Sequence, residues 1–219
     1  SENVEIQVKR SSRKYEMKFV NGEVESPLGE IDTVGRRNTG TSIRFWPNSN
    51  YFDTVKISTS RLRHLLKAKA VLCPGLKMKF LNERDMESDE WYFEDGLFGY
   101  LTESMSEDIS LPSPPVTGSL KSRDGEIEWG LYWCVEPADL LRESYVNLIP
   151  TIQGGSHLSG MKQGLVEALR DFIDSRNLMP RGIKITADDV AENCAYLLSV
   201  RMKNPQFSGQ TKERLSSRS

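Results

Sequence analysis

The chain has 219 residues, of which 37% are hydrophobic and 27% are charged, so it can bury one substantial core or one core and part of another. Its net charge of −2 does not by itself indicate a nucleic-acid-binding protein. Three widely spaced cysteines argue against a disulfide framework and against a cysteine zinc site, so we expect no metal ligands in this chain. Neither end carries a signal peptide or a membrane-spanning run. We therefore expect a cytoplasmic protein with no membrane contact.

In chain order, alternating apolar residues between residues 3 and 20 predict strands, followed by Asn21-Gly22, a pair typical of tight turns. Residues 41–46 predict a further strand, which ends at a proline. From Ser60 the apolar residues follow a helical period, which predicts a helix over residues 60–71. Its basic residues lie off the apolar face.

Further strands are predicted at residues 77–82, 91–94, 127–135, 144–148 and 195–202. Residues 111–118 are predicted to be a loop, because three prolines there disfavour regular structure. A strong helix is predicted from Ser159 to about Arg176, and Thr186 with Asp189 forms a capping box for a short one. The interleaved strands and helices predict an α/β (α+β) fold.

Two overlapping patterns near residue 155 suggest chemistry. The stretch 155–162 approaches a phosphate-binding P-loop, but Met161 stands where the lysine is required, so we reject a Walker site. Ser156-His157 suggests nucleophilic catalysis, yet no third group is indicated. We expect Ser156 or Ser159 to cap the following helix instead.

The charged residues are segregated along the chain. Basic residues gather in the N-terminal third, and an acidic run follows at residues 83–95. A basic patch is one way to contact DNA, although solvated faces explain such runs more simply. Asp188, Asp189 and Glu192 suggest a cation site, but a charged first helical turn explains them more simply.

The most informative pattern lies at residues 208–215. Ser208-Gly209 is flexible, and Gln210, Thr211 and Lys212 then project an amide, a hydroxyl and an ammonium group where helix-favouring residues begin. The unpaired N–H groups at a helix start, together with the lysine charge, make a binding site for an anion such as a terminal phosphate. On these residues alone, a solvated turn remains the simpler interpretation.

Five segments resemble, in order and spacing, the B subunits of bacterial type II topoisomerases. They span nearly the whole chain: residues 37–47, 66–75, 145–157, 180–184 and 209–218. The second and the last are similar to the topoisomerase IV type rather than to the gyrase type. Three alternatives stay open: the B subunit of DNA gyrase, another ATPase of the GHKL class such as a mismatch-repair protein, and a non-catalytic binding module.

The resemblance implies three parts of the chain. Residues 1–52 correspond to the C-terminal strands of an incomplete GHKL ATPase domain. Residues 53–208 correspond to a transducer domain with a ribosomal-protein-like βαβ fold, whose left-handed crossover is an exception to the usual handedness. Residues 209–219 correspond to a phosphate-sensing loop and the start of a linker helix. The chain therefore indicates a fragment of a longer protein.

The resemblance also implies the roles of three residues. Thr41 would help to bind the adenine edge of ATP, Gln210 and Lys212 would bind its γ-phosphate, and Lys212 would be the catalytic residue. The family motifs that activate water, hold Mg²⁺ and read adenine do not occur in this sequence. We therefore expect the chain alone to be inactive.

For the complete enzyme, the resemblance implies ATP-driven decatenation and relaxation of DNA in chromosome segregation. ATP and Mg²⁺ would be the cofactors. The partners would be the A subunit of topoisomerase IV in a heterotetramer, double-stranded DNA, and a second copy of the B subunit when ATP is bound. The basic side of the helix at residues 60–71 is expected to help line the cavity for the captured duplex.

Overall fold

The computed structural model describes residues 1–105, 110–135, 140–180, 182–183 and 185–217. The chain divides into two compact units, Ser1–Ser58 and Thr59–Ser219. This division lies a few residues after the boundary between residues 52 and 53 that the sequence predicts.

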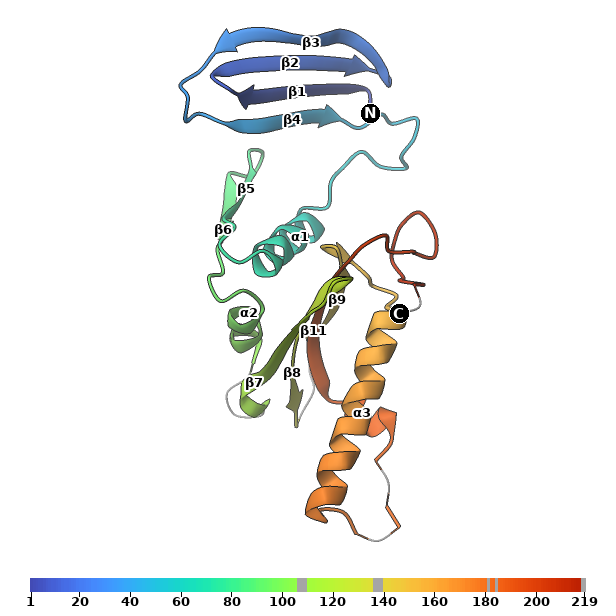
Figure 1. The fold of residues 1–219 in the computed structure, drawn as a ribbon. Helices are drawn as coiled ribbons and strands as arrows, with labels where there is room; N and C mark the ends of the chain where they lie inside the picture. Colours follow the sequence, from blue (N-terminus) through green and yellow to red (C-terminus); the bar gives the residue numbers. More distant parts are fainter. Residues whose placement is uncertain (106–109, 136–139, 181, 184, 218–219) are drawn as a thin grey trace. The chain divides into compact units, whose positions relative to one another are not determined.

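The first unit is a single antiparallel sheet in the order β3-β2-β1-β4 (Figure 1). Its strands are β1 (Asn3–Arg10), β2 (Arg13–Val20), β3 (Glu23–Thr33) and β4 (Gly40–Trp46). Asn21 and Gly22 both have positive φ in the turn between β2 and β3, as the sequence predicts. None of the unit's 58 residues, all of them described, is buried. The sheet therefore has no core of its own.

The second unit is built on a five-stranded sheet in the order β10-β9-β11-β8-β7. The strands are β7 (Ser110–Lys121), β8 (Gly125–Cys134), β9 (Arg142–Val146), β10 (Ile149–Pro150) and β11 (Cys194–Met202). β9 and β11 are parallel and the other pairs are antiparallel. Between them the chain forms α3 (Ser156–Arg176) and α4 (Ala187–Ala191), which gives the expected βαβ unit. The hand of its crossover stays a prediction.

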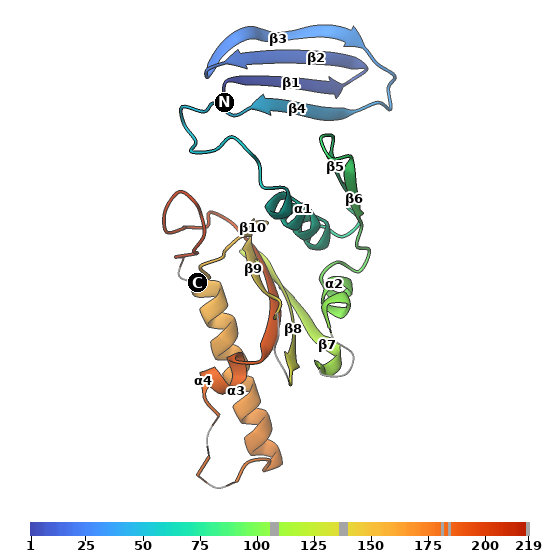
Figure 2. The same ribbon diagram turned by 180° about the vertical axis from the view of Figure 1, so that it is seen from behind.

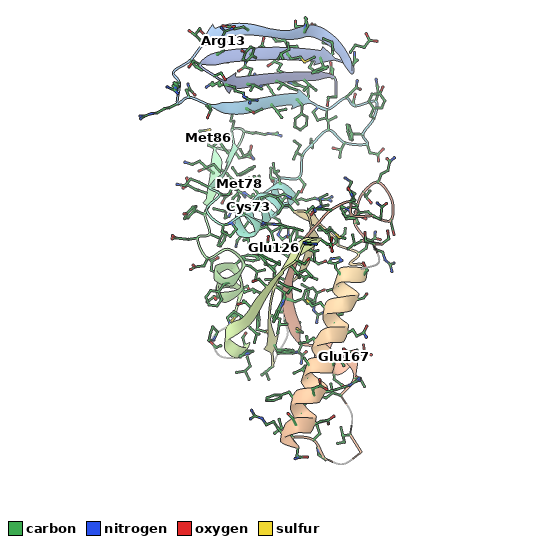
Figure 3. All side chains as sticks on the ribbon, in the orientation of Figure 1. Arg13, Cys73, Met78, Met86, Glu126 and Glu167 are labelled. Atoms are coloured by element: carbon green, nitrogen blue, oxygen red, sulfur yellow. The ribbon has the colours of Figure 1, made fainter. Side chains whose placement is uncertain are left out.

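Two helices and a hairpin complete the second unit: α1 (Thr59–Leu72), α2 (Gly96–Ser104), and β5 (Met78–Asn82) paired with β6 (Glu87–Trp91) (Figure 2). Met86, labelled in Figure 3, stands at the turn of this hairpin and is 76% exposed. The hairpin is held by α1, whose residues contact both of its strands.

Alternating residues of the central strands supply a core on each face of the sheet. Leu197 of β11 and Tyr145 of β9 pack with residues of α1 and α2. Their neighbours Leu198 and Val146 pack on the other face, against residues of α3 and the C-terminal segment. Because successive side chains in a strand point to opposite faces, β9 and β11 each contribute residues to both cores.

Two predicted elements are wrong in the structure. Residues 111–118 form part of β7 rather than a loop, because β7 is an edge strand and its prolines lie in an irregular stretch between Leu111 and Val116 where no ladder N–H is needed. The strand predicted at 91–94 lies instead at Glu87–Trp91. Cross-strand pairs such as Lys79 with Glu90 support this charged strand.

Candidate functional site

Residues 208–214, here called the lysine loop, form a surface loop of the second unit whose two ends lie next to each other. At the neck, the Ser208 N–H donates to the carbonyl of Arg214 at 2.9 Å, and Phe207 and Leu215 form an antiparallel bridge. Gly209 and Lys212 both have positive φ, at 85° and 58°. The left-handed region costs a lysine roughly 1–2 kcal/mol, so the surrounding structure holds this turn in place.

The side chains of Gln210 and Lys212 lie on this loop and are exposed. In the described part of the chain, neither side chain makes a hydrogen bond or an ion pair. The Lys212 ammonium is therefore free of any described carboxylate that would compete with an incoming anion. An accessible ammonium of this kind can form charge-assisted hydrogen bonds with an anion.

No helix begins between residues 203 and 217, so the helical run expected from Arg214 is wrong over these residues. Residues 218 and 219 lie outside the described residues, and the start of a linker helix there stays a prediction. Leu215 explains the absence of a helix over residues 203–217. Its side chain is 4% exposed and packs with Val146, Leu198 and Val200. Its backbone bridges Gly155 on one side and Phe207 on the other, which keeps the chain extended. The helix dipole invoked from the sequence therefore does not act at Lys212.

The start of α3 lies directly against this extended segment. The Leu215 N–H donates to the Gly154 carbonyl at 3.1 Å, and the Ser156 N–H donates to the Leu215 carbonyl at 3.2 Å. The Ser156 hydroxyl donates to the carbonyl of Ser217 at 2.5 Å. The expected capping of α3 by Ser156 or Ser159 is thus wrong, because Gly155 is the N-cap residue and no side chain caps this helix.

A chain of buried polar groups fixes the same region to the sheet. The hydroxyls of Ser144 and Thr151 lie 2.7 Å apart, and the Thr151 hydroxyl lies 3.1 Å from Nε2 of His157 in the first turn of α3. Burial lowers the pKa of His157, because the protonated ring would lose its hydration there. His157 therefore has a packing role rather than the nucleophilic one that its pairing with Ser156 suggests.

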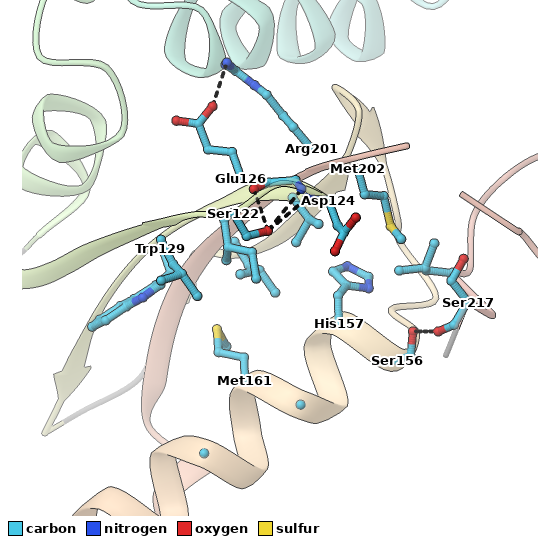
Figure 4. A pocket seen from close by; sticks show the side chains of 18 of the residues that line it. Ser122, Asp124, Glu126, Trp129, Ser156, His157, Met161, Arg201, Met202 and Ser217 are labelled. Carbon is cyan, nitrogen blue, oxygen red and sulfur yellow. Dashed lines mark hydrogen bonds and ion pairs between the residues drawn. The ribbon is translucent and has the colours of Figure 1, made fainter. Parts of the chain in front are cut away.

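A cavity of about 940 Å³ opens between α3 and the sheet (Figure 4). Its wall is mainly apolar, with Trp129, Leu165 and Met161 among the lining residues, and His157 and Ser217 lie at one end. Met161 also packs against the core that contains Leu215. Residues 155–162 thus form the cap and first turns of a packed helix, which agrees with the rejection of a P-loop.

The acidic residues suggested as a cation site have local roles. Asp189 accepts hydrogen bonds from the backbone N–H and the hydroxyl of Thr186, which lower the pKa of this carboxyl. The Asp189 N–H donates in turn to the Thr186 hydroxyl, which completes the predicted capping box. Over the described ranges, no group of three His, Cys, Asp or Glu side chains is placed to hold a metal ion.

The basic side chains of α1 are largely engaged within the unit. Arg63 makes ion pairs with Glu87 and Asp89 of β6 at 3.0 and 2.7 Å. Lys67 lies over the ring of Tyr100, 4.8 Å from its centroid, and Lys69 donates to the Leu148 carbonyl. The basic side chains of α1 that are expected to face DNA thus make contacts within the second unit.

Part of the acidic run is paired in the same way. Glu90 pairs with Lys77 at 2.7 Å and with Lys79 at 2.8 Å. These hydrogen bonds lower the pKa of Glu90 to about 2. The hairpin is thus held together partly by its own charges.

The three predicted site residues do not all belong to one unit. The structure brings Gln210 and Lys212 together on the lysine loop. Thr41 lies on β4 of the first unit, opposite Val8 of β1, and is exposed. Its participation in the same site stays a prediction. Sequence reasoning missed the residues that anchor the loop, although the pair Gly154-Gly155 and the isolated apolar Leu215 were visible signals.

A family model described as DNA gyrase B matches residues 96–219, more than half of the chain. The chain belongs to the DNA gyrase B family. Relatives include the DNA topoisomerase 4 B subunit of Pseudomonas aeruginosa, 53% identical over 218 residues, and that of Escherichia coli, 49% identical over 218 residues. Both alignments cover 100% of this chain and 35% of the relative, so the chain spans about a third of their length.

Solved structures of this family also match across the chain. The topoisomerase IV ATP-binding domain of Francisella tularensis, determined with a small-molecule inhibitor, is 41% identical with a TM-score of 0.79. The 43K ATPase domain of Thermus thermophilus gyrase B, determined with an aminocoumarin, is 27% identical with a TM-score of 0.76. Each match covers 99% of this chain and 58% of the other. Among the described residues, no helix is long and apolar enough to cross a membrane.

Proposed function

We propose that this chain is the part of a topoisomerase IV B subunit that reports the state of bound ATP to the rest of the enzyme. The observation that carries the proposal is the presentation of Lys212. Its side chain is exposed on a loop whose two ends are joined by a hydrogen bond between Ser208 and Arg214. The residue after the loop, Leu215, is buried in the core with residues of β9 and β11. A lysine held in this way combines an accessible charge with a fixed attachment.

In this proposal Lys212 and Gln210 bind the γ-phosphate. Lys212 supplies a positive charge to the phosphate oxygens as negative charge develops on them, and Gln210 donates hydrogen bonds from its amide. Thr41 contributes to the adenine edge from the first unit. ATP supplies the phosphoryl group that is cleaved. The residues of this chain fit the phosphate, whereas the described residues offer no cluster for Mg²⁺, whose ligands belong to family motifs that this sequence does not contain.

The proposed reaction of the complete enzyme is strand passage of double-stranded DNA, in which the A subunit is the partner and a second B subunit joins when ATP binds. Movement of the lysine loop would change the orientation of the second unit, a domain-closure switch of the kind that a γ-phosphate commonly controls. We place the enzyme in the cytoplasm, where the chromosome lies and where cysteines stay reduced.

The comparisons favour the topoisomerase IV type over the gyrase type. Identity to topoisomerase 4 B subunits reaches 53%, whereas the DNA gyrase B subunit of Chlamydia pneumoniae is 32% identical over 222 residues. The test uses the complete B subunit with its own A subunit, ATP and two DNA substrates. We expect efficient decatenation of linked circles without negative supercoiling of relaxed plasmid. ATP-dependent supercoiling would instead assign the gyrase reaction.

A further inference from the structure

Residues 151–157, here called the junction segment, connect β10 to the first turn of α3. They make the described backbone hydrogen bonds to residues 213–217. Gln153 stands out within it. Its backbone N–H donates to the carbonyl of Glu213 at 3.0 Å, and its side-chain amide donates to the Glu213 carboxylate at 2.8 Å. Glu213 is the neighbour of Lys212. One residue of the junction segment therefore holds both the backbone and the side chain next to the site lysine.

The rest of the junction segment is itself immobilised, so Gln153 acts from a fixed base. On one side, Gly154 and Ser156 pair with the backbone of Leu215. On the other side, the Thr151 hydroxyl contacts both the buried hydroxyl of Ser144 on β9 and the ring of His157. A hydrogen bond from a fixed donor positions its acceptor, whereas one between two mobile side chains positions neither.

The turn at Lys212 needs such support. Lys212 has φ of 58°, a conformation that is uncommon and unfavourable for a lysine. The Glu213 carbonyl follows this turn directly, and its acceptance of the Gln153 N–H fixes the direction of the chain as it leaves Lys212. The second hydrogen bond, to the Glu213 side chain, turns that carboxylate toward Gln153.

We propose that Gln153 is a positioning residue for Lys212: through its two hydrogen bonds to Glu213 it sets the placement of the Lys212 ammonium and keeps the Glu213 carboxylate turned away from it. The proposal rests on the proposed function, since it assigns Lys212 to the γ-phosphate. It adds a residue that does not touch nucleotide and acts only through its neighbour.

The test compares five variants of the complete B subunit, assayed with the A subunit, DNA and ATP. Gln153→Ala removes the amide donor. Gln163→Ala is the matched control, since Gln163 also donates to a glutamate, Glu167, at 3.0 Å, in a hydrogen bond that is exposed like that of Gln153 but lies within α3. Lys212→Ala reports whether the proposed function holds. Loss of one positioning hydrogen bond corresponds to a drop of about two- to tenfold in kcat for ATP hydrolysis.

We expect Gln153→Ala to lower kcat by about that factor with KM for ATP changed by less than about twofold, and Gln163→Ala to match the wild type. Gln153→Glu, which opposes two carboxylates, is expected to be worse. Combining it with Glu213→Gln restores a donor and an acceptor, and is expected to recover most of the lost kcat. A merely structural role of Gln153 would instead appear as a lower free energy of unfolding for Gln153→Ala, with kcat of the folded protein unchanged.

The outcomes separate the two claims. If Lys212→Ala abolishes turnover while Gln153→Ala and Gln153→Glu retain wild-type kcat, the positioning role is wrong and the proposed function stands. If Lys212→Ala itself retains wild-type turnover, the proposed function fails and the positioning role fails with it. A double exchange no better than Gln153→Glu alone would also overturn the positioning role.

Discussion

Gly155 and Leu215 approach so closely that a Cβ atom on residue 155 would lie 2.3 Å from the Leu215 carbonyl oxygen and 2.6 Å from its nitrogen. Gly155 has φ of 138°, a conformation that glycine adopts far more readily than any other residue. The two backbones meet where α3 begins and where the lysine loop returns to the core. The attachment of the loop thus depends on a position at which no side chain fits.

Gly155→Ala is therefore expected to destabilise the second unit strongly, because the atoms in the way are backbone and have no alternative rotamer. A loss of about 2–4 kcal/mol is expected for overpacking combined with an unfavourable φ. Urea denaturation of the 219-residue chain, followed by tryptophan fluorescence, measures it.

Gly160→Ala is the matched control on the same helix. A Cβ atom there meets nothing within 4 Å, and helical alanine is favoured over glycine by about 0.5–1 kcal/mol. We expect this variant to be slightly more stable than the wild type. Equal stability of the Gly155 and Gly160 variants would contradict the close approach at Leu215.

The two units are expected to differ sharply in amide hydrogen exchange. Every residue of the first unit is at least partly exposed, and Ile43 and Phe45 of its edge strand are 64% and 53% exposed. β11 contributes several of the most buried residues of the second unit. A sheet without a core opens readily, so we expect amides of β1–β4 to exchange within minutes while those of β11 stay protected for far longer. Equal protection in mass-spectrometric exchange would show that the first unit is stable by itself.

Burial of His157 predicts a loss of stability in mild acid. Its folded pKa lies below the usual value of 6.5, so the unfolded chain takes up the proton first as pH falls. The stability is fully present above about pH 6.5 and decreases below it, until the folded pKa is reached. Asp124, Glu126, Arg201 and Lys203 line the same cavity, and a hydrogen bond from Lys121 lowers the pKa of Glu126, further from this window.

His157→Gln keeps a polar group near Thr151 but cannot take up a proton. Between pH 7.5 and 5.0, we expect the wild type to lose more unfolding free energy than this variant. Parallel loss of stability in both proteins would show that His157 does not titrate differently on folding.

The sequence was sufficient for the elements with strong local signals. The helical period around Leu65 placed α1, and Thr186 with Asp189 placed α4, because caps and amphipathic faces act within a few residues. The sequence did not predict the conformation of segments that is determined by residues far away in the chain. Helix-favouring residues follow Lys212, yet Leu215 is extended because Gly155, 60 positions earlier, pairs with it.

For the candidate site, too, the sequence predicted some residues and missed others. Lys212 and Gln210 were found because their residue types carry the chemistry and because the segment resembles a family motif. Gln153 was not, since a glutamine has no distinctive pattern and its importance arises only from its distance to Glu213. The proline-rich β7 was missed for a related reason. An edge position, which removes the need for a full N–H ladder, is a property of the whole sheet.

The 219-residue chain alone is expected not to hydrolyse ATP. In the proposed site, Lys212, Gln210 and Thr41 would supply charge and hydrogen bonds to a nucleotide but no general base for the attacking water. A coupled assay with Mg²⁺ and millimolar ATP is expected to show no turnover above the rate of a Lys212→Ala chain. Turnover that depends on Lys212 would show that the chain holds a complete active site.

The most direct test of the account is the ATP turnover of the complete B subunit carrying Lys212→Ala, measured at saturating ATP beside Lys203→Ala, a control lysine that precedes the loop. Removal of one preorganised electrostatic contact slows turnover by about 10²–10³. We expect that loss for Lys212→Ala, a clear loss for Lys212→Arg because a planar guanidinium does not replace a compact ammonium, and a wild-type rate for Lys203→Ala. A near-normal rate for Lys212→Ala at saturating ATP would contradict the account.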